Sequence, residues 1–266
     1  MNDSFEYNSF EYNRGTTPLL ISMPHNSSLI PASTAHNMTE DAQLSKDTDW
    51  FIDRLYDFAP SMGVHIIKPK YSRYYIDLNR DPTGKDLYPG ADNTELCPTT
   101  DFCKQALYLE GKNPQQAEIT KRIDTVWSPY HQSIKQTLDN IVRQHGYAIL
   151  FDAHSIASKV PRFFKGSLPD FNFGNADGKS CSVSMIECIE KLSFQPWSSV
   201  INGRFKGGYI TRENGDPDND IHAIQLELSQ ATYLDETTLE WDVVKSETVK
   251  IQLQKLIQCL LDWKNN

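Results

Sequence analysis

The sequence lacks the features of a membrane-spanning, secreted or nucleic-acid-binding protein. No apolar run among its 266 residues approaches the roughly 20 residues that cross a bilayer as a helix. The first residues contain neither the basic stretch nor the apolar stretch of a secretion signal. Basic residues number 26 against 35 acidic ones, and the net charge of -9 would repel a polyanion. We therefore expect a cytoplasmic protein whose partners include no nucleic acid and no membrane; its oligomeric state stays open.

Cysteine is scarce and follows no recognisable pattern. There are five cysteines and no C-x-x-C pair, so the sequence predicts neither a disulfide framework nor a thiolate zinc site. Cys188 and Cys259 lie in mostly apolar segments with helical periodicity, where inert buried thiols are common. We expect reduced thiols and assign no chemistry to these two residues.

Strand patterns and helix patterns alternate along the chain. Apolar or alternating runs predict strands at residues 18–23, 64–68, 74–78, 147–151 and 221–228. Helical spacing predicts helices at about 48–63, 114–145, 181–192 and 239–263, with Ser180 as an N-cap and Gly146 as a C-cap. The alternation indicates an α/β protein with a mixed sheet. We expect a loose N-terminal arm at 1–15 and one domain at 16–266.

Polar side chains follow the ends of three predicted strands: His25, Asp152 with His154, and Glu227. In open α/β sheets the ligand crevice lies at the carboxyl ends of the strands. Two imidazoles and one carboxylate are a common catalytic zinc set, with an open position for water. The third ligand is open between Asp49, which heads the next helix, and Asp47.

Each of these residues also has an ordinary structural explanation. A histidine after a strand is often a packing residue, and Asp49 in a first helical turn would stabilise the helix dipole. Glu227 interrupts an apolar segment; it either faces solvent or is a buried carboxylate that needs a partner or a task.

Arginines near two other segments indicate an anionic ligand. Arg73, Asn79 and Arg80 lie at the ends of the predicted strand at 74–78, where guanidinium groups can bind carboxylates in a bidentate manner. Arg204 and Arg212 flank Gly207-Gly208, where backbone and ligand can approach closely. The alternatives are that Arg73 and Arg80 pair with neighbouring aspartates and that the glycine segment is a mobile turn.

Taken in order, the motifs between about residues 16 and 236 resemble the N-formylglutamate amidohydrolase family. The segments are Met23-Pro24-His25-Asn26-Ser27, Asp47-Thr48-Asp49-Trp50, Tyr71-Ser72-Arg73, Ile76-Asp77-Leu78-Asn79-Arg80, Leu87-Tyr88-Pro89-Gly90, Asp152-Ala153-His154-Ser155, the run from Asn202 to Arg212, and Gln225-Leu226-Glu227-Leu228. This family is related to the zinc carboxypeptidases and aspartoacylases. The resemblance therefore implies a phosphorylase/hydrolase-like fold, with a twisted mixed sheet between helices. The wider group takes two ligands from H-x-x-E, but here Ser28 stands in the second place.

The resemblance also implies an activity: zinc-dependent hydrolysis of N-formyl-L-glutamate, a small dianion, to formate and L-glutamate in histidine breakdown. It favours Asp49 as the third ligand of one Zn2+ per chain, although another divalent metal would fit the same residues. We expect Asp152 to orient a ligating imidazole. Two alternatives stay open: another zinc amidohydrolase of N-acyl amino acids, similar to aspartoacylase, and a metal-free binding module. The implied roles are metal ligation by His25, Asp49 and His154, proton transfer by Glu227, oxyanion stabilisation by Arg73, and binding of the two substrate carboxylates by Asn79 and Arg80 and by Arg212 with Tyr209 or Arg204.

Overall fold

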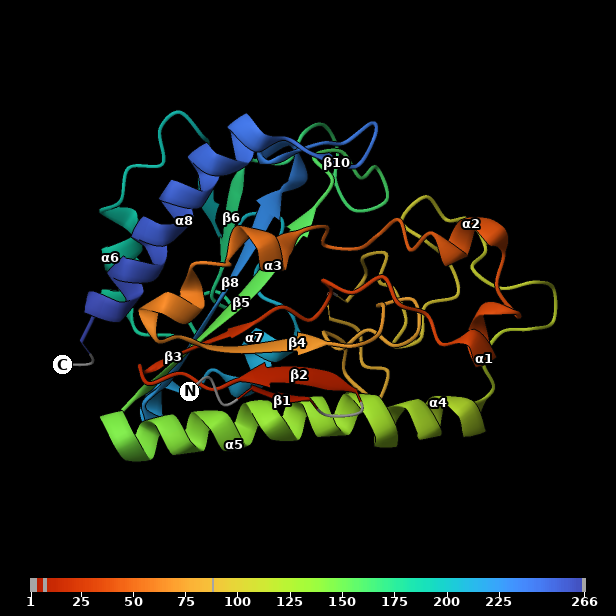
Figure 1. Cartoon of the computed structure of the whole chain (residues 1–266), viewed down its shortest axis with the longest axis horizontal. Helices are drawn as coiled ribbons and strands as arrows, with labels where there is room; N and C mark the ends of the chain where they lie inside the picture. Colours follow the sequence, from red (N-terminus) through yellow and green to blue (C-terminus); the bar gives the residue numbers. More distant parts are fainter. Residues whose placement is uncertain (1–3, 7–8, 88, 265–266) are drawn as a thin grey trace.

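A mixed sheet of eight strands forms the centre of the computed structural model, which describes residues 4–6, 9–87 and 89–264 (Figure 1). The strands are β1 (Ser4–Glu6), β2 (Phe10–Asn13), β3 (Leu19–Ser22), β4 (His65–Pro69), β5 (Ala148–Ile156), β6 (Phe171–Gly174), β7 (Ser199–Ile201) and β8 (Ile221–Ser229). Their order is β1-β2-β4-β3-β5-β8-β6-β7. The inner strands β4, β3, β5 and β8 run parallel, whereas β2 and β6 pair antiparallel with them. The predicted α/β class with a mixed sheet is confirmed.

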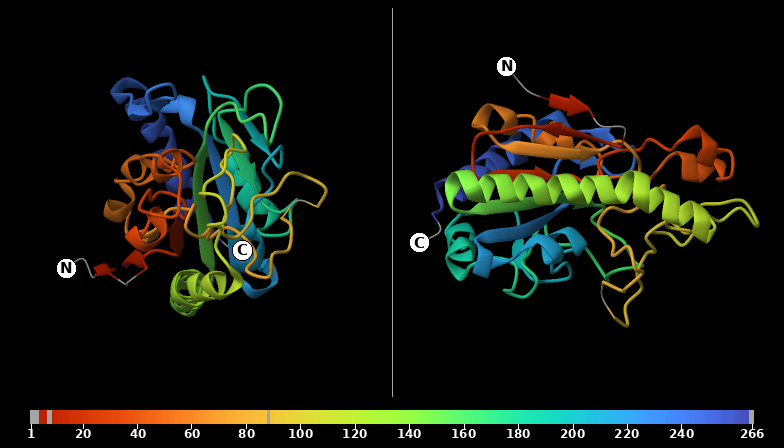
Figure 2. Two further views of the ribbon diagram at one scale, coloured as in Figure 1. Left: turned by 90° about the vertical axis from the view of Figure 1, so that its right-hand side faces the viewer. Right: turned by 90° about the horizontal axis from the view of Figure 1, so that it is seen from below.

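Helices cover both faces of this sheet. The long helix α5 runs across one face, and α3, α6 and α8 lie against the other (Figures 1 and 2). A small hairpin of β9 (Leu234–Asp235) and β10 (Glu240–Trp241) precedes α8. The helices are α1 (Ala32–Ala35), α2 (Glu40–Gln43), α3 (Ile52–Leu55), α4 (Gln116–Arg122), α5 (Ser128–His145), α6 (Val183–Glu190), α7 (Tyr209–Asn214) and α8 (Val243–Asp262), with 3-10 turns at Ala59–Met62, Pro217–Asn219 and Gln230–Thr232 and a π-turn at Ile123–Trp127.

The inner strands alternate between two apolar cores, one on each face. In β3, Leu19 and Ile21 enter the core beneath α8, whereas Leu20 enters the core beneath α5. Successive side chains of a strand point to opposite faces, so a strand covered on both sides is apolar at every position. This explains the continuous apolar runs at 18–23 and 147–151 and why their strands form where they were predicted.

The segment at 74–78 is not a strand, contrary to the prediction. It forms turns: the Tyr75 backbone N donates to Ser72 O at 2.9 Å, and the Tyr74 N donates to Ser72 Oγ at 3.1 Å. Serine and aspartate side chains that bind nearby backbone groups compete with strand pairing. Ile76 and Leu78 of this segment are buried in the core beneath α5 without entering the sheet, whereas Tyr74 packs in a separate small cluster with Met38 and Tyr108.

Two helix boundaries also differ from the prediction. The helix expected from about residue 48 begins only at Ile52, because Phe51 has a left-handed backbone with φ of 58°. The N-cap of α6 is Ser182, whose Oγ accepts from Met185 N, not Ser180. Gly146 is the left-handed C-cap of α5, as predicted.

The described part of the predicted N-terminal arm is not loose. Residues 10–13 form β2, which pairs with β4, and Phe10 is buried with its ring 6.0 Å from that of Tyr130. The aromatic side chain of Phe10 therefore fixes this segment to the core beneath α5. Residues 1–3 and 7–8 of the arm, and Tyr88 of the Leu87–Gly90 motif, lie outside the described residues. The division into an arm and one domain stays a prediction.

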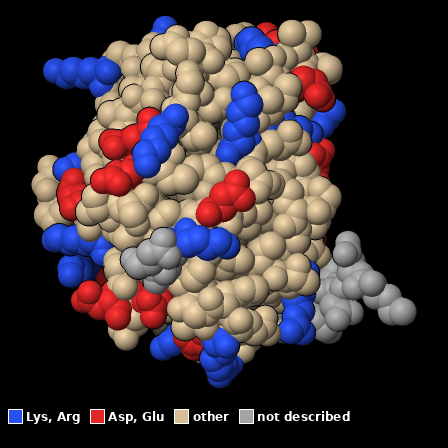
Figure 3. Space-filling view, turned by 90° about the vertical axis from the view of Figure 1, so that its left-hand side faces the viewer, with Lys and Arg blue, Asp and Glu red and all other residues tan. Residues whose placement is uncertain are grey.

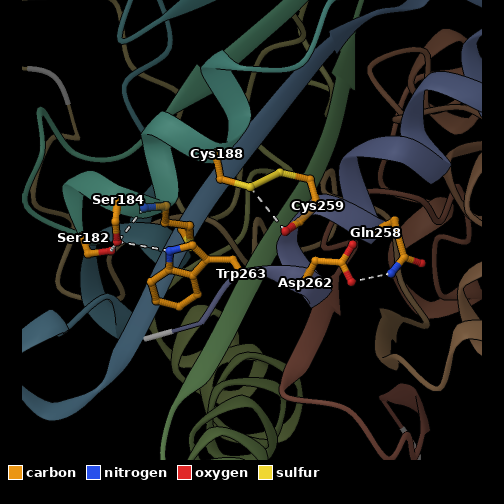
Figure 4. The surroundings of a disulfide bond; sticks show 8 residues. Ser182, Ser184, Cys188, Gln258, Cys259, Asp262 and Trp263 are labelled. Atoms are coloured by element: carbon orange, nitrogen blue, oxygen red, sulfur yellow. Dashed lines mark hydrogen bonds between the residues drawn. A yellow bond between two sulfur atoms is a disulfide. The ribbon is translucent and has the colours of Figure 1, made fainter. Parts of the chain in front are cut away.

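Cys188 and Cys259 form a disulfide, so the expectation of reduced thiols is wrong for this pair (Figure 4). The bond joins α6 to α8, which pack side by side and place the two Cα atoms 6.6 Å apart, within disulfide reach. No sequence pattern predicts this bond, because helical periodicity does not tell which helices become neighbours. Cys97, Cys103 and Cys181 are free.

Charge is mixed on the face of the molecule that lies on the left in Figure 1. Basic and acidic side chains are interspersed there, and neither sign forms an extended patch among the described residues (Figure 3). Within those residues, none of the helices combines the length and the apolar character needed to cross a membrane.

Candidate active site

Two of the predicted site residues stand on neighbouring strands. His154 on β5 and Glu227 on β8 are directly paired in the parallel register, near the carboxyl ends of both strands. Both side chains are buried, with exposed fractions of 3% and 8%. Backbone pairing alone therefore brings an imidazole and a carboxylate together.

Two further predicted metal-ligand residues, His25 and Asp49, stand on loops that meet this strand pair. His25 follows β3, and its backbone oxygen accepts from Asp49 N at 3.0 Å, which joins the two loops. The Asp49 carboxylate reaches β5, where its Oδ2 accepts from Ser155 N at 3.1 Å. The loops thus add a second imidazole and a carboxylate beside His154.

His25, Asp49 and His154 direct one donor atom each to a common point. Nδ1 of His154 lies 3.1 Å from Nδ1 of His25 and 3.2 Å from Oδ2 of Asp49, and the remaining separation is 3.7 Å. A tetrahedral zinc ion with bonds of about 2.1 Å holds its ligand atoms about 3.4 Å apart. The three buried donors therefore match three corners of such a site.

The second nitrogen of each imidazole faces a carboxylate. Nε2 of His25 lies 2.7 Å from Asp77 Oδ1, and Nε2 of His154 lies 2.9 Å from Asp152 Oδ2. These carboxylates favour a proton on Nε2 and leave Nδ1 as an acceptor, the arrangement typical of metal-binding histidines. Two ring nitrogens and the Asp49 oxygen would then converge with no hydrogen between them, so the donor set fits a cation.

The electrostatics of the site agree with a charged Asp49. Burial opposes the charge, but the hydrogen bonds and positive charge that His154 and His25 supply when their Nδ1 atoms are protonated outweigh it and hold the pKa of this carboxyl below its usual range. A cation at the same point would act in the same direction. Asp47, the alternative ligand, lies elsewhere: its Oδ2 accepts from Phe102 N at 2.8 Å, and burial raises its pKa to about 6. The geometry favours Asp49 over Asp47.

A small cavity adjoins the three metal-ligand candidates. Its volume is about 60 Å³, and its polar wall contains six predicted residues besides Gln225. Burial raises the pKa of Glu227 to about 8, although the nearby positive charges of His154 and Arg73 oppose the shift. A carboxyl that titrates near neutrality can both accept and deliver a proton. The six predicted residues are His25, Arg73, Asn79, Arg80, His154 and Glu227.

The two arginines of the cavity have different surroundings. The Arg73 Nη2 donates to Asp77 Oδ2 at 3.0 Å, so the aspartate pairing considered for Arg73 exists while the guanidinium still faces the cavity. Arg80 donates through Nε and Nη2 to the backbone oxygen and hydroxyl of Thr94, at 3.2 and 2.8 Å. Asn79, which directly precedes Arg80 in the sequence, accepts through its Oδ1 from Ile210 N at 2.8 Å.

Three predicted carboxylate-binding residues lie outside this lining. The Arg212 side chain is exposed on α7, and its Nε donates to Gly207 O at 2.8 Å. Arg204 donates to Phe163 O at 2.6 Å, and Tyr209 lines a different cavity with Trp127 and His131. The structure therefore brings together the metal-ligand candidates, Glu227, Arg73, Asn79 and Arg80, but not these three.

Comparison with known proteins identifies the family of the chain. The family model described as N-formylglutamate amidohydrolase matches residues 17–234. The chain belongs to the N-formylglutamate amidohydrolase family. It is 43% identical over 257 residues to an N-formylglutamate deformylase of Pseudomonas putida, covering 95% of both chains. It is 42% identical over 255 residues to an N-formylglutamate deformylase of Pseudomonas aeruginosa, covering 95% of this chain and 96% of the relative.

Solved structures show the same fold. An N-formylglutamate amidohydrolase from Ralstonia eutropha JMP134 superposes with a TM-score of 0.80 at 22% identity over 96% of both chains. A gene product of Agrobacterium tumefaciens superposes with a TM-score of 0.70 at 14% identity, covering 95% of this chain and 93% of that one. The resemblance predicted from the motifs is confirmed.

In this N-formylglutamate amidohydrolase family member, one helical stretch holds the loop that carries Asp77, Asn79 and Arg80. Three of its side chains bind carbonyls of this loop: Arg122 Nη1 donates to Tyr75 O at 2.6 Å, Trp127 Nε1 donates to Arg80 O at 3.0 Å, and His131 Nε2 lies 2.8 Å from Leu78 O. The π-turn between α4 and α5 lies within this stretch, just before Pro129, which has no N–H for the helical ladder. The loop thus has a fixed shape although it belongs to no strand.

Sequence reasoning missed several residues of the site. Asp77 was considered only as a partner of Arg73, yet its Oδ1 faces His25 and also accepts from Asn79 N at 2.8 Å. Gln225, two residues before Glu227 on the same face of β8, accepts from Gly208 N at 2.6 Å and could have been found from the strand period. The apolar side of the cavity gave no local signal; it consists of Leu87, Phe102, Ile156, Phe163 and Phe205.

Proposed function

We propose that this protein hydrolyses the formyl amide of N-formyl-L-glutamate and releases formate and L-glutamate, with one zinc ion held by His25, Asp49 and His154. The observation that carries the proposal is the convergence of three donor atoms beside the buried carboxyl of Glu227, in a chain of the N-formylglutamate amidohydrolase family. A divalent ion at these ligands would supply Lewis-acid chemistry, lowering the pKa of water and polarising a carbonyl oxygen.

Glu227 is the proton carrier in this proposal. Its carboxylate would take a proton from the attacking water and deliver it to the amine nitrogen as the formyl C–N bond breaks. Its raised pKa favours holding the proton, and a nearby cation would lower that pKa toward the value that a base needs. Arg73, which faces the same cavity, would stabilise the negative oxygen that forms on the formyl carbon.

Charged groups of the protein would bind the two carboxylates of the substrate. Arg80 lines the cavity, and together with the Asn79 amide nitrogen it can bind one of them. For the second carboxylate we propose Arg212 with Tyr209 or Arg204. Because these residues lie outside the lining, this part requires α7 and, for Arg204, the segment before it to approach the substrate. A site built for a formyl group should exclude even an acetyl group.

The decisive test combines metal analysis with a substrate comparison. Chelation should abolish hydrolysis of N-formylglutamate, and zinc should restore it at about one ion per chain. N-acetylaspartate and N-acetylglutamate should be poor substrates. A chelated protein with full activity would exclude the zinc mechanism, and faster turnover of N-acetylaspartate would favour the aspartoacylase-like alternative. Binding of N-formylglutamate without turnover in the zinc-loaded protein would favour a binding module.

Partners and location are part of the same proposal. A small dianionic substrate, with no nucleic acid or membrane partner, is supported by the acidic composition and by the arginines of the cavity. A cytoplasmic location is supported by the expected place of the reaction in histidine breakdown. The Cys188–Cys259 disulfide counts against this location, since disulfides are rare in the cytosol.

A further inference from the structure

The segment that carries Asp49 has no secondary structure to hold it. Residues 48–50 precede α3, and Phe51 after them has a left-handed backbone, a conformation that a bulky residue rarely adopts. Such a backbone persists only where its surroundings fix it. The position of the Asp49 carboxylate therefore depends on contacts from elsewhere in the fold.

Two buried side chains hold the backbone on either side of Asp49. Gln230 Nε2 donates to Thr48 O at 3.0 Å, and the Tyr233 hydroxyl donates to Trp50 O at 2.8 Å. Both donors come from the chain just after β8, the strand that carries Glu227. Each flanking carbonyl is thus fixed to the end of the same strand.

Ser155 joins these two donors into one chain of hydrogen bonds. Its Oγ lies 2.7 Å from the Tyr233 hydroxyl and accepts from Gln230 Nε2 at 3.4 Å. Because the Tyr233 hydrogen goes to Trp50 O, the Ser155 hydroxyl donates to the Tyr233 oxygen. The backbone N of the same serine donates to Asp49 Oδ2. The exposed fractions of Ser155, Tyr233 and Gln230 are 2%, 0% and 4%, so water does not compete for these bonds.

We propose that Ser155, Gln230 and Tyr233 form a buried clamp that positions Asp49 and thereby sets the affinity of the site for its metal ion. The inference rests on the proposed metal site and adds to it three positioning residues, none of which lines the cavity or supplies a donor atom to the ion. Without the clamp, Asp49 would have to be ordered when the ion binds, and that cost would weaken binding.

The test measures zinc affinity by competition with a chromogenic chelator, together with the thermal unfolding of the metal-free protein. Tyr233→Phe removes the hydroxyl and keeps the ring. Tyr56→Phe is the matched control, because the Tyr56 hydroxyl is buried in the same core without a hydrogen-bond partner. We expect Tyr233→Phe to weaken zinc binding about 10- to 100-fold and Tyr56→Phe to leave it unchanged.

A double mutant sharpens the result. Ser155→Ala removes the hydroxyl but keeps the backbone N–H that binds Asp49. If Ser155 and Tyr233 act as one clamp, the double variant should lose less affinity than the sum of the two single losses in free energy. Should Tyr233→Phe not fold, Gln230→Met breaks the bond to Thr48 O and carries the same expectation.

Each outcome decides between the clamp and a role in folding alone. Lower stability of metal-free Tyr233→Phe with zinc affinity equal to that of the parent would overturn the clamp and leave the metal site intact. A parent protein that binds no zinc would overturn the proposed function and the clamp together. Zinc affinity that falls in Tyr233→Phe and stays unchanged in Tyr56→Phe supports the clamp.

Discussion

The site has two sides that are built in different ways. The strand side consists of His154 and Glu227 with Asp152 on β5 and β8, where nine successive residue pairs of a parallel ladder fix every side chain. The loop side consists of the segments around Asp49 and at 73–80, which no ladder holds. Its backbone carbonyls are bound by side chains of distant residues. Backbone pairing thus positions the proposed proton carrier and one proposed ligand, whereas the positions of the other proposed ligands depend on side-chain networks.

The largest expected effect tests the strand side alone. Glu227→Gln keeps the shape of the side chain and removes the proton carrier, so kcat for N-formylglutamate should fall about 10²- to 10⁴-fold. Zinc content and melting temperature should match those of the parent, because the ladder and the ligands are unchanged. Glu247→Gln, an exposed change on α8, is the control. Near-parental kcat in Glu227→Gln would assign proton transfer to another residue.

The second prediction compares one carboxylate from each side. Asp77→Asn and Asp152→Asn should each weaken zinc binding about 10- to 100-fold, because each removes the carboxylate that faces a ligating imidazole. Their effects on stability should differ. Both oxygens of Asp77 are engaged and one of them pairs with buried Arg73, whereas Asp152 Oδ1 has no hydrogen-bond partner.

Breaking a buried ion pair costs about 3 to 5 kcal/mol, so urea unfolding should show Asp77→Asn to be the less stable variant by a few kcal/mol. Equal stabilities would mean that Arg73 finds another carboxylate partner, for which Asp49 Oδ1 at 3.7 Å is a candidate. The loop side would then tolerate the loss better than its network suggests.

The third prediction concerns the two arginines proposed for the substrate carboxylates. Arg80→Lys keeps the charge but loses the planar fork, so kcat/KM for N-formylglutamate should fall about 10-fold or more. Arg212→Ala should have a smaller effect, because this side chain is exposed outside the cavity lining. Steady-state rates with N-formylglutamate and N-formylglutamine separate the two variants. Equal losses, with a weaker preference for glutamate in Arg212→Ala, would show that α7 approaches the bound substrate.

The smallest expected effect is a dependence of stability on pH. Burial lowers the pKa of His131 from 6.5 to about 4, so the unfolded chain binds a proton before the folded protein does. The contribution of neutral His131 to the free energy of unfolding is complete above pH 6.5 and is lost as the pH falls toward 4. At pH 5 the free energy of unfolding is lower by about 2 kcal/mol. His131→Gln removes this titration.

The difference in unfolding free energy between pH 7 and pH 5, measured by urea denaturation, should therefore be smaller in His131→Gln than in the parent. His36→Gln, an exposed change, is the control. An unchanged difference would show that His131 contributes little and that other groups, such as buried His65, dominate. Because His131 holds Leu78 O, this titration acts on the loop side.

The same division explains what the sequence could predict. Apolar runs locate β3, β5 and β8, and a polar residue at the end of such a run is a site candidate, which is how His25, His154 and Glu227 were found. Asp49 was reached only with the help of the family resemblance. The apolar residues of the segment at 74–78 predict a strand, whereas Ser72 favours a turn. Packing of Ile76 and Leu78 in the core beneath α5 decides between these two signals.

Contacts between distant residues account for the rest. Nothing around Tyr233 or Gln230 in the sequence points to residues 48–50, since the bonds join segments more than 180 residues apart. The disulfide between Cys188 and Cys259 depends in the same way on the packing of α6 against α8. Strands can be predicted from local sequence patterns, whereas hydrogen-bond networks between distant loops cannot.

The π-turn at Ile123–Trp127 changes the rotational phase of a long helix. In an uninterrupted α-helix, residues five apart lie about 140° apart around the axis, so Arg122 and Trp127 would point in different directions. The wider turn brings both to the side that meets the loop at 75–80, in line with His131. A single-residue deletion within the turn would restore a regular helix but rotate α4 relative to α5. The extra residue of the π-turn thus lets side chains from α4 and α5 bind three carbonyls of the same loop, and this fixes the shape of the loop beneath the candidate active site.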